Sequence, residues 1–130
     1  MLTPFYGALF ALMLIGLSVR TLRLRRHYGV PIGPSREPVL ERATRVHANF
    51  CEYVPLSLIC MALLEILSGP GWWIHVLGLS LLAGRAAHAY GVSQLEEDYR
   101  YRVFGMAATF TVLSLSAFGI LAIYATAGVL

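Results

Sequence analysis

The chain alternates between four long apolar stretches and shorter polar connections. The first stretch, residues 2–19, and the last, residues 103–130, carry no charged side chain. About 20 predominantly apolar residues let a helix cross the hydrocarbon core of a bilayer, and each stretch is roughly that long. The pattern predicts a single domain over residues 1–130, an all-α, up-down bundle of four transmembrane helices. With their polar ends, these helices are expected at about residues 2–26, 40–68, 72–93 and 98–128.

The composition agrees with a membrane location. Hydrophobic residues make up 58% of the chain and charged residues 13%, against roughly 45–50% and about 25% in soluble domains. No basic residue precedes residues 2–19, and no Ala-x-Ala cleavage motif follows them. We therefore expect the first apolar stretch to be a retained helix and not a signal peptide.

The arginines predict how the helices are oriented. All ten basic residues are arginine: seven lie at residues 20–45, one at residue 85, and two at residues 100 and 102. The short turn at residues 69–71 and both termini hold none. Because cytoplasmic loops of membrane proteins are enriched in basic residues, the two long connections are expected in the cytoplasm and both termini outside it.

Costly polar side chains stand at the start of the second predicted helix. Arg45, Asn49 and Glu52 have the spacing i, i+4, i+7, which places them on one stripe of the helix. A charge within the bilayer costs roughly 2.5–3.5 kcal/mol even on insertion scales. Glu52 is therefore expected to pair with Arg85 or Arg102 of a neighbouring helix.

The other three helices bring polar groups to the same end of the bundle. Within the predicted helices the arginines outnumber Glu52, because the acidic run at residues 96–98 is expected to be a solvated loop. An excess of arginine favours an anionic ligand or anionic lipid headgroups; a purely structural network that locks the helices together is the alternative. The polar groups concerned are Arg23, Arg85, His88 and Arg102.

Two other kinds of site are not indicated. Cys51 and Cys60 are nine residues apart, about 13 Å along one helix, whereas a disulfide needs Cα atoms about 4.4–6.8 Å apart. They are expected to be packing residues, and the chain shows no metal-ligand spacing. The arginines stand at helix ends beside the bilayer, without a soluble domain or interleaved aromatic residues, so nucleic-acid binding is not expected.

Four segments carry a resemblance to a known family. "ERATRVHANFCEYVP", residues 41–55, resembles the second-helix signature of the MAPEG family, the membrane-associated proteins in eicosanoid and glutathione metabolism. That signature is an Arg, a His two residues on, an Asn two further, a Glu three later, and then a Pro. "LRLRR" at residues 22–26, "GRAAHAYG" at 84–91 and "YRYRVFG" at 99–105 resemble the end of the family's first helix, its third helix and the start of its fourth.

The resemblance implies a homotrimer with a glutathione site between adjacent subunits, open to the cytoplasm. Glutathione would be a co-substrate, with its carboxylates held by arginines and its ammonium by Glu52. Arg102 resembles the arginine thought to hold the thiolate in enzymatic members; a guanidinium favours the ionised form of a nearby thiol. The implied binding residues are Arg23, Arg45, His47, Asn49, Glu52, Arg85, His88 and Tyr90.

The function implied is a membrane-bound glutathione transferase, or also a peroxidase, that joins the glutathione thiolate to lipophilic electrophiles. Ala48, Val92, Gly105 and Met106 depart from the prostaglandin and leukotriene branch, which can have an Arg or a Tyr in these regions. The departures argue against eicosanoid substrates and suit a bacterial inner-membrane member. Two alternatives stay open: a non-catalytic lipid-binding or scaffold protein of the same fold, and an accessory subunit of a membrane complex.

Overall fold

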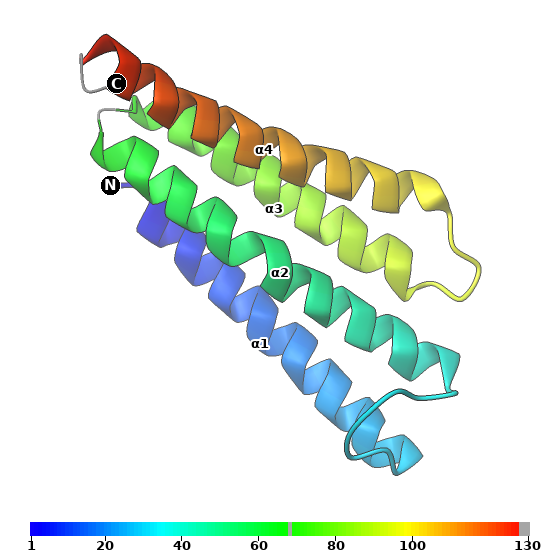
Figure 1. Cartoon of the computed structure of the whole chain (residues 1–130). Coiled ribbons are helices and arrows are strands. Elements are labelled where there is room, and N and C mark those ends of the chain that lie inside the picture. The colour runs from blue at the N-terminus through cyan, green and yellow to red at the C-terminus, as the bar shows by residue number, and fades with distance from the viewer. Residues whose placement is uncertain (68, 128–130) are drawn as a thin grey trace.

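The computed structural model of the chain describes residues 1–67 and 69–127, which form four helices and no strand (Figure 1). The all-α, four-helix architecture expected from the sequence is thereby confirmed. The ends expected for the second and fourth helices, residues 68 and 128, lie outside the described residues. The helices are α1 (Thr3–Tyr28), α2 (Pro38–Ile66), α3 (Gly71–Ser93) and α4 (Tyr99–Thr126).

The helices run alternately up and down, so that the two ends of the bundle differ in character (Figure 1). At one end, here called the terminal end, lie the N-terminus, the C-terminal end of α4 and the short α2–α3 turn. At the other, here called the Arg-rich end, lie the connections at residues 29–37 and 94–98. α1 packs mainly on α2 and α3 mainly on α4, while α2 contacts both α3 and α4.

Local sequence signals set the helix ends. Pro38 occupies the first turn of α2, where its missing N–H leaves no helical hydrogen bond unmade. Gly29 ends α1 with φ of 64°, a left-handed conformation that glycine adopts without strain. Asp98 precedes α4 and accepts a hydrogen bond of 3.0 Å from the Arg100 backbone N–H. Pro55 lies inside α2, which continues through it.

All four helices contribute to one apolar core. Large apolar side chains also cover the outer surface: Leu12 on α1 is 67% exposed and Phe118 on α4 is 68% exposed. An apolar outer surface is suited to contact with lipid. Helices are stable in lipid because their backbone N–H and C=O groups bond to one another within the helix. The buried core residues are Tyr6, Phe10, Phe50, Val54, Met61, Leu64, Ile74, Leu77, Leu81 and Val112.

Three of the described helices, α1, α2 and α4, are long and apolar enough to cross a membrane. α3 was expected to be a fourth span; it is not one of these three, and it carries the polar residues His75, Arg85 and His88. Its place in the bundle still requires it to cross. α2 and α4 both run from the Arg-rich end to the terminal end (Figure 1), so α3 must return the chain between them.

Several polar groups at the terminal end make hydrogen bonds with one another. The Glu65 carboxylate on α2 accepts hydrogen bonds from the backbone N–H groups of Leu2 and Thr3, the latter at 2.9 Å. These N–H groups at the start of a helix have no partner within it. The Tyr6 hydroxyl lies 2.9 Å from Nδ1 of His75. Polar side chains thus tie α1 to α2 and α3 at this end.

Glycines bring α3 and α4 unusually close near the Arg-rich end. A Cβ added at Gly105 on α4 would lie 2.5 Å from the Gly84 carbonyl oxygen and 2.6 Å from His88 Cβ. A Cβ added at Gly84 would lie 2.8 Å from the Ala108 side chain. Small residues permit such close approach of membrane helices. The contact fixes the position of α3 along the length of α4, next to His88.

Gly105→Ala is expected to separate α3 from α4 and to destabilise the protein by about 1–3 kcal/mol, the usual cost of overpacking a tight contact. Gly16→Ala is the matched control, because a Cβ at that position would meet no atom within 4 Å apart from its own stretch of helix. Thermal unfolding of both variants in detergent measures the difference. Equal stability of the two variants would contradict the close contact.

Candidate functional site

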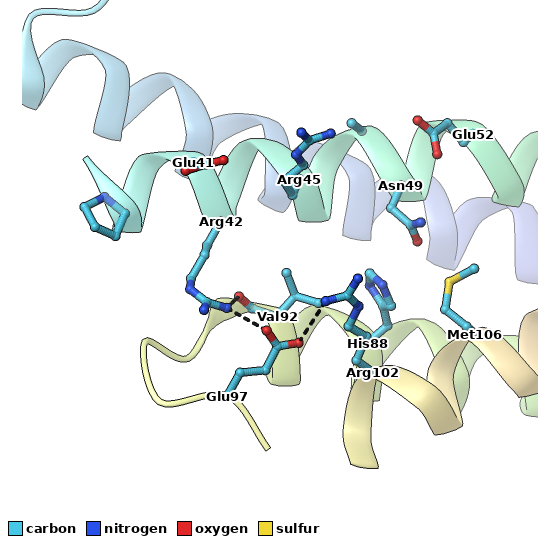
Figure 2. A pocket seen from close by; sticks show the side chains of 12 residues that line it. Glu41, Arg42, Arg45, Asn49, Glu52, His88, Val92, Glu97, Arg102 and Met106 are labelled. Carbon is cyan, nitrogen blue, oxygen red and sulfur yellow. Dashed lines mark hydrogen bonds and ion pairs between the residues drawn. The ribbon is translucent and has the colours of Figure 1, made fainter. Parts of the chain in front are cut away.

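A cavity of about 660 Å³ lies at the Arg-rich end, between α2 on one side and α3, α4 and the connection joining them on the other (Figure 2). Its wall combines charged, polar and apolar side chains. Residues of α2 spaced three or four apart form one side of the cavity, as expected for one face of a helix. The lining residues are Pro38, Glu41, Arg42, Arg45, Ala48, Asn49, Glu52, His88, Val92, Glu97, Arg102 and Met106.

Five of the nine site residues predicted from the sequence line this cavity. Arg45, Asn49 and Glu52 come from α2, His88 from α3 and Arg102 from α4. Three helices that are distant in sequence therefore bring these side chains to one place. The roles assigned to these residues stay predictions.

Three of the other predicted residues lie away from the cavity wall. Arg23 is exposed on α1. Tyr90 is exposed on α3, and its ring meets that of Tyr101 edge to face at 5.1 Å between centroids. His47 faces α1, where its Nε2 lies 3.0 Å from the Ser18 hydroxyl.

Arg85 does not line the cavity but lies directly behind it. Its side chain is among the most buried in the chain, with 1% of the residue exposed. Nη2 donates a hydrogen bond of 2.9 Å to the Asn49 side-chain oxygen, whereas Nε and Nη1 have no hydrogen-bond partner among the described residues. Because a buried guanidinium with unpaired N–H groups is costly, the protein depends on this hydrogen bond. The bond also joins α2 to α3.

The predicted pairing of Glu52 with an arginine of a neighbouring helix is wrong. Glu52 is exposed, and no ion pair joins it to Arg85 or Arg102 within the described residues. Figure 2 shows Asn49 directed toward α3 and α4, whereas Glu52 points away from them. A neutral amide reaches the buried guanidinium in place of the carboxylate, which stays exposed on the single chain.

A second correction concerns the acidic run at residues 96–98. Glu96 and Asp98 are exposed as expected, but only 6% of the Glu97 side chain is exposed. Its Oε2 accepts a hydrogen bond of 2.9 Å from Arg42, and its Oε1 lies 3.7 Å from Nη1 of Arg102 (Figure 2). Sequence reasoning missed this residue because loop residues have no periodicity that reveals which side chain turns inward.

The charge balance of the cavity also differs from the expected excess of cations. Three guanidinium groups and three carboxylates line the wall: Arg42, Arg45, Arg102, Glu41, Glu52 and Glu97. Within the described residues, the ion pairs at this cavity are those that Glu97 makes with Arg42 and Arg102. Arg45, Glu41 and Glu52 make no ion pair with any residue that the structure describes. The wall thus offers charges of both signs, and Arg85 adds one further cation behind it.

An apolar part of the wall adjoins these charges. Ala48 on α2, Val92 at the end of α3 and Met106 on α4 all line the cavity. An apolar wall next to charged groups can hold a molecule that is polar at one end and lipophilic at the other.

These features define an integral membrane bundle of four helices with a charged cavity at one end. The sequence pattern of the MAPEG family matches residues 3–122, and the chain belongs to that family. It is similar to inner membrane protein YecN of Escherichia coli strain K12, with 36% identity over 115 residues that cover 88% of this chain and 86% of the relative. The protein of the same name from Escherichia coli O6:H1 strain CFT073 has the same identity and coverage.

Asn49→Ala is expected to destabilise the protein by about 1.5–3 kcal/mol, because it removes the hydrogen bond to the buried Arg85 guanidinium. Asn49→Asp retains an acceptor oxygen and is expected to keep most of the stability. Thermal unfolding in detergent compares the two variants. Wild-type stability in Asn49→Ala would show that Arg85 does not depend on Asn49.

Proposed function

We propose that the protein is a membrane-bound glutathione transferase that joins the glutathione thiolate to lipophilic electrophiles. The observation that carries the proposal is the mixed charge of the cavity, which adjoins an apolar wall formed partly by Met106. Membership of the MAPEG family supports it. We place the protein in the bacterial inner membrane, with the Arg-rich end and its cavity facing the cytoplasm, where glutathione would enter.

The charges of glutathione match those of the cavity. Glutathione carries two carboxylates and one ammonium, and therefore needs cations and an anion at one site. Arg45 can hold a carboxylate, because the planar fork of arginine matches a carboxylate. Arg85, which is buried behind the wall, would act on the guest through its hydrogen bond to Asn49. Glu52, which is exposed and has no ion pair among the described residues, can accept the ammonium. Asn49 can bond the peptide with the donor N–H groups that its contact with Arg85 leaves free.

Arg102 is the residue that we assign to the thiol. Its side chain is 53% exposed and lines the cavity, so its guanidinium is accessible to a guest. A nearby positive charge stabilises the thiolate, which is the nucleophilic form. The thiolate then attacks the electrophile: a carbon–sulfur bond forms, the leaving group departs with its electron pair, and the thiol proton passes to solvent.

We further propose that the active form is a homotrimer and that the remaining predicted residues act there. Arg23 and Tyr90 are exposed on the single chain, and in the trimer they would contribute to the cavity of a neighbouring subunit. His47 would act through its contact with Ser18. The electrophile would reach the cavity from the lipid, past the apolar residues of α4.

Arg102→Ala is expected to lower the rate of glutathione conjugation to 1-chloro-2,4-dinitrobenzene by about 10²-fold, a typical loss when one group that stabilises developing or resident charge is removed. Arg100→Ala is the matched control. Arg100 lies on the same helix, is exposed and is absent from the cavity wall. Its removal takes away the same charge and is expected to leave the rate unchanged.

The same purified protein distinguishes the alternatives. Calorimetry with glutathione is expected to show binding to the wild type. No binding and no conjugation would contradict the proposal. A phospholipid that copurifies with its phosphate at the arginines would instead favour a non-catalytic lipid-binding protein, for which the apolar Ala48, Val92 and Met106 would contact the acyl chain.

A further inference from the structure

Glu97 is a buried carboxylate placed between two cavity arginines that belong to different helices. It lies in the connection between α3 and α4, and only 6% of its side chain is exposed. Arg42 reaches it from α2 and Arg102 from α4 (Figure 2). Arg42 also donates a hydrogen bond of 3.1 Å to the Val92 carbonyl oxygen. The connection is thus held against α2, and the Glu97 carboxylate is fixed within the cavity wall.

The two carboxylate oxygens of Glu97 are held very differently. Oε2 makes a hydrogen bond of 2.9 Å with Arg42, which is a short, charge-assisted contact. Oε1 is buried and has no hydrogen-bond partner among the described residues. Its distance of 3.7 Å from Nη1 of Arg102 allows attraction between the charges but is too long for a hydrogen bond. Glu97 therefore attracts Arg102 without forming a hydrogen bond to its guanidinium.

This arrangement places an anion of the protein beside the arginine that we assign to the thiolate. A thiolate at Arg102 would share that guanidinium with Glu97 and would also lie close to a second negative charge. The shared cation favours the thiolate, whereas the like charge disfavours it. The balance between the two decides how much of the bound thiol is ionised.

We propose that Glu97 is an internal anion that shares Arg102 with the guest, and that it limits both the binding of an anion at that position and the ionisation of the bound thiol. The inference rests on the proposed function and adds a residue that determines specificity. Apart from Arg102, the other charged or titratable groups of the cavity wall come from α2 and α3. They are Glu41, Arg42, Arg45, Glu52 and His88. Of these, Arg42 loses its ion pair when the charge of Glu97 is removed but keeps its hydrogen bond to the Val92 carbonyl oxygen.

Two glutathione derivatives test the proposal by calorimetry on the full-length protein in detergent. Glutathione sulfonate carries a fixed anion in place of the thiol, and S-methylglutathione carries none there. Glu97→Gln keeps the size of the side chain and removes its charge. It is expected to tighten sulfonate binding by about tenfold, a typical coupling between neighbouring groups, and to leave binding of the S-methyl derivative unchanged.

Glu96→Gln is the matched control, because it removes the same charge from the adjacent, exposed position. It is expected to change the binding of neither derivative. With glutathione itself, the ultraviolet absorbance of the bound thiolate is expected to rise at neutral pH in Glu97→Gln alone. A role of Glu97 confined to stability would shift the binding of both derivatives together and leave the thiolate signal unchanged.

The outcomes separate this inference from the proposed function. Unchanged or weaker sulfonate binding in a folded Glu97→Gln variant would overturn the inference while the binding of glutathione stands. No binding of either derivative to the wild type or the variants would overturn the proposed function and the inference together. Glu97→Asp, which retains the charge but withdraws it from Arg102, is expected to act in the same direction as Glu97→Gln and serves if that variant does not fold.

Discussion

The burial of Arg85 is the constraint on which the Arg-rich end depends. A guanidinium that is 1% exposed within an apolar bundle must find a partner, because an unpaired buried charge is strongly destabilising. Asn49 supplies the partner from α2. The neighbouring residue, Gly84, supplies the close contact with Gly105 on α4. Two adjacent residues of α3 therefore fix its position against both other helices, and one turn later His88 reaches the cavity wall.

The two ends of the bundle use polar residues in different ways. At the terminal end, the Glu65 carboxylate meets the backbone N–H groups at the start of α1, and Tyr6 meets His75. At the Arg-rich end, Arg45 and Glu52 line a cavity without an ion pair among the described residues. Charges kept unpaired next to a bilayer are expensive. Their concentration at one end is therefore the reason to place ligand binding there.

The sequence predicted most of what depends on helical period and little of what depends on loops. Arg45, Asn49 and Glu52 line one cavity because their spacing places them on one stripe of α2. His47 follows Arg45 by two residues, about 200° around the helix, and accordingly faces α1; only the family resemblance had included it. Glu97 lies in a connection without periodicity, so its burial between two arginines was visible only from the packing of three separate segments. Asn49, and not the predicted Glu52, contacts the buried guanidinium of Arg85. Which of the two side chains does so depends on the direction in which each one points, and helical spacing does not reveal that direction.

The central proposal is that the cavity at the Arg-rich end holds a small molecule that carries charges of both signs and a thiol. A structure of the purified protein in lipid, determined with glutathione present, tests it most directly. We expect density for the tripeptide between α2 and α4, with its carboxylates on guanidinium groups and its sulfur at Arg102. Density for a phospholipid headgroup there, or glutathione bound elsewhere on the protein, would contradict it.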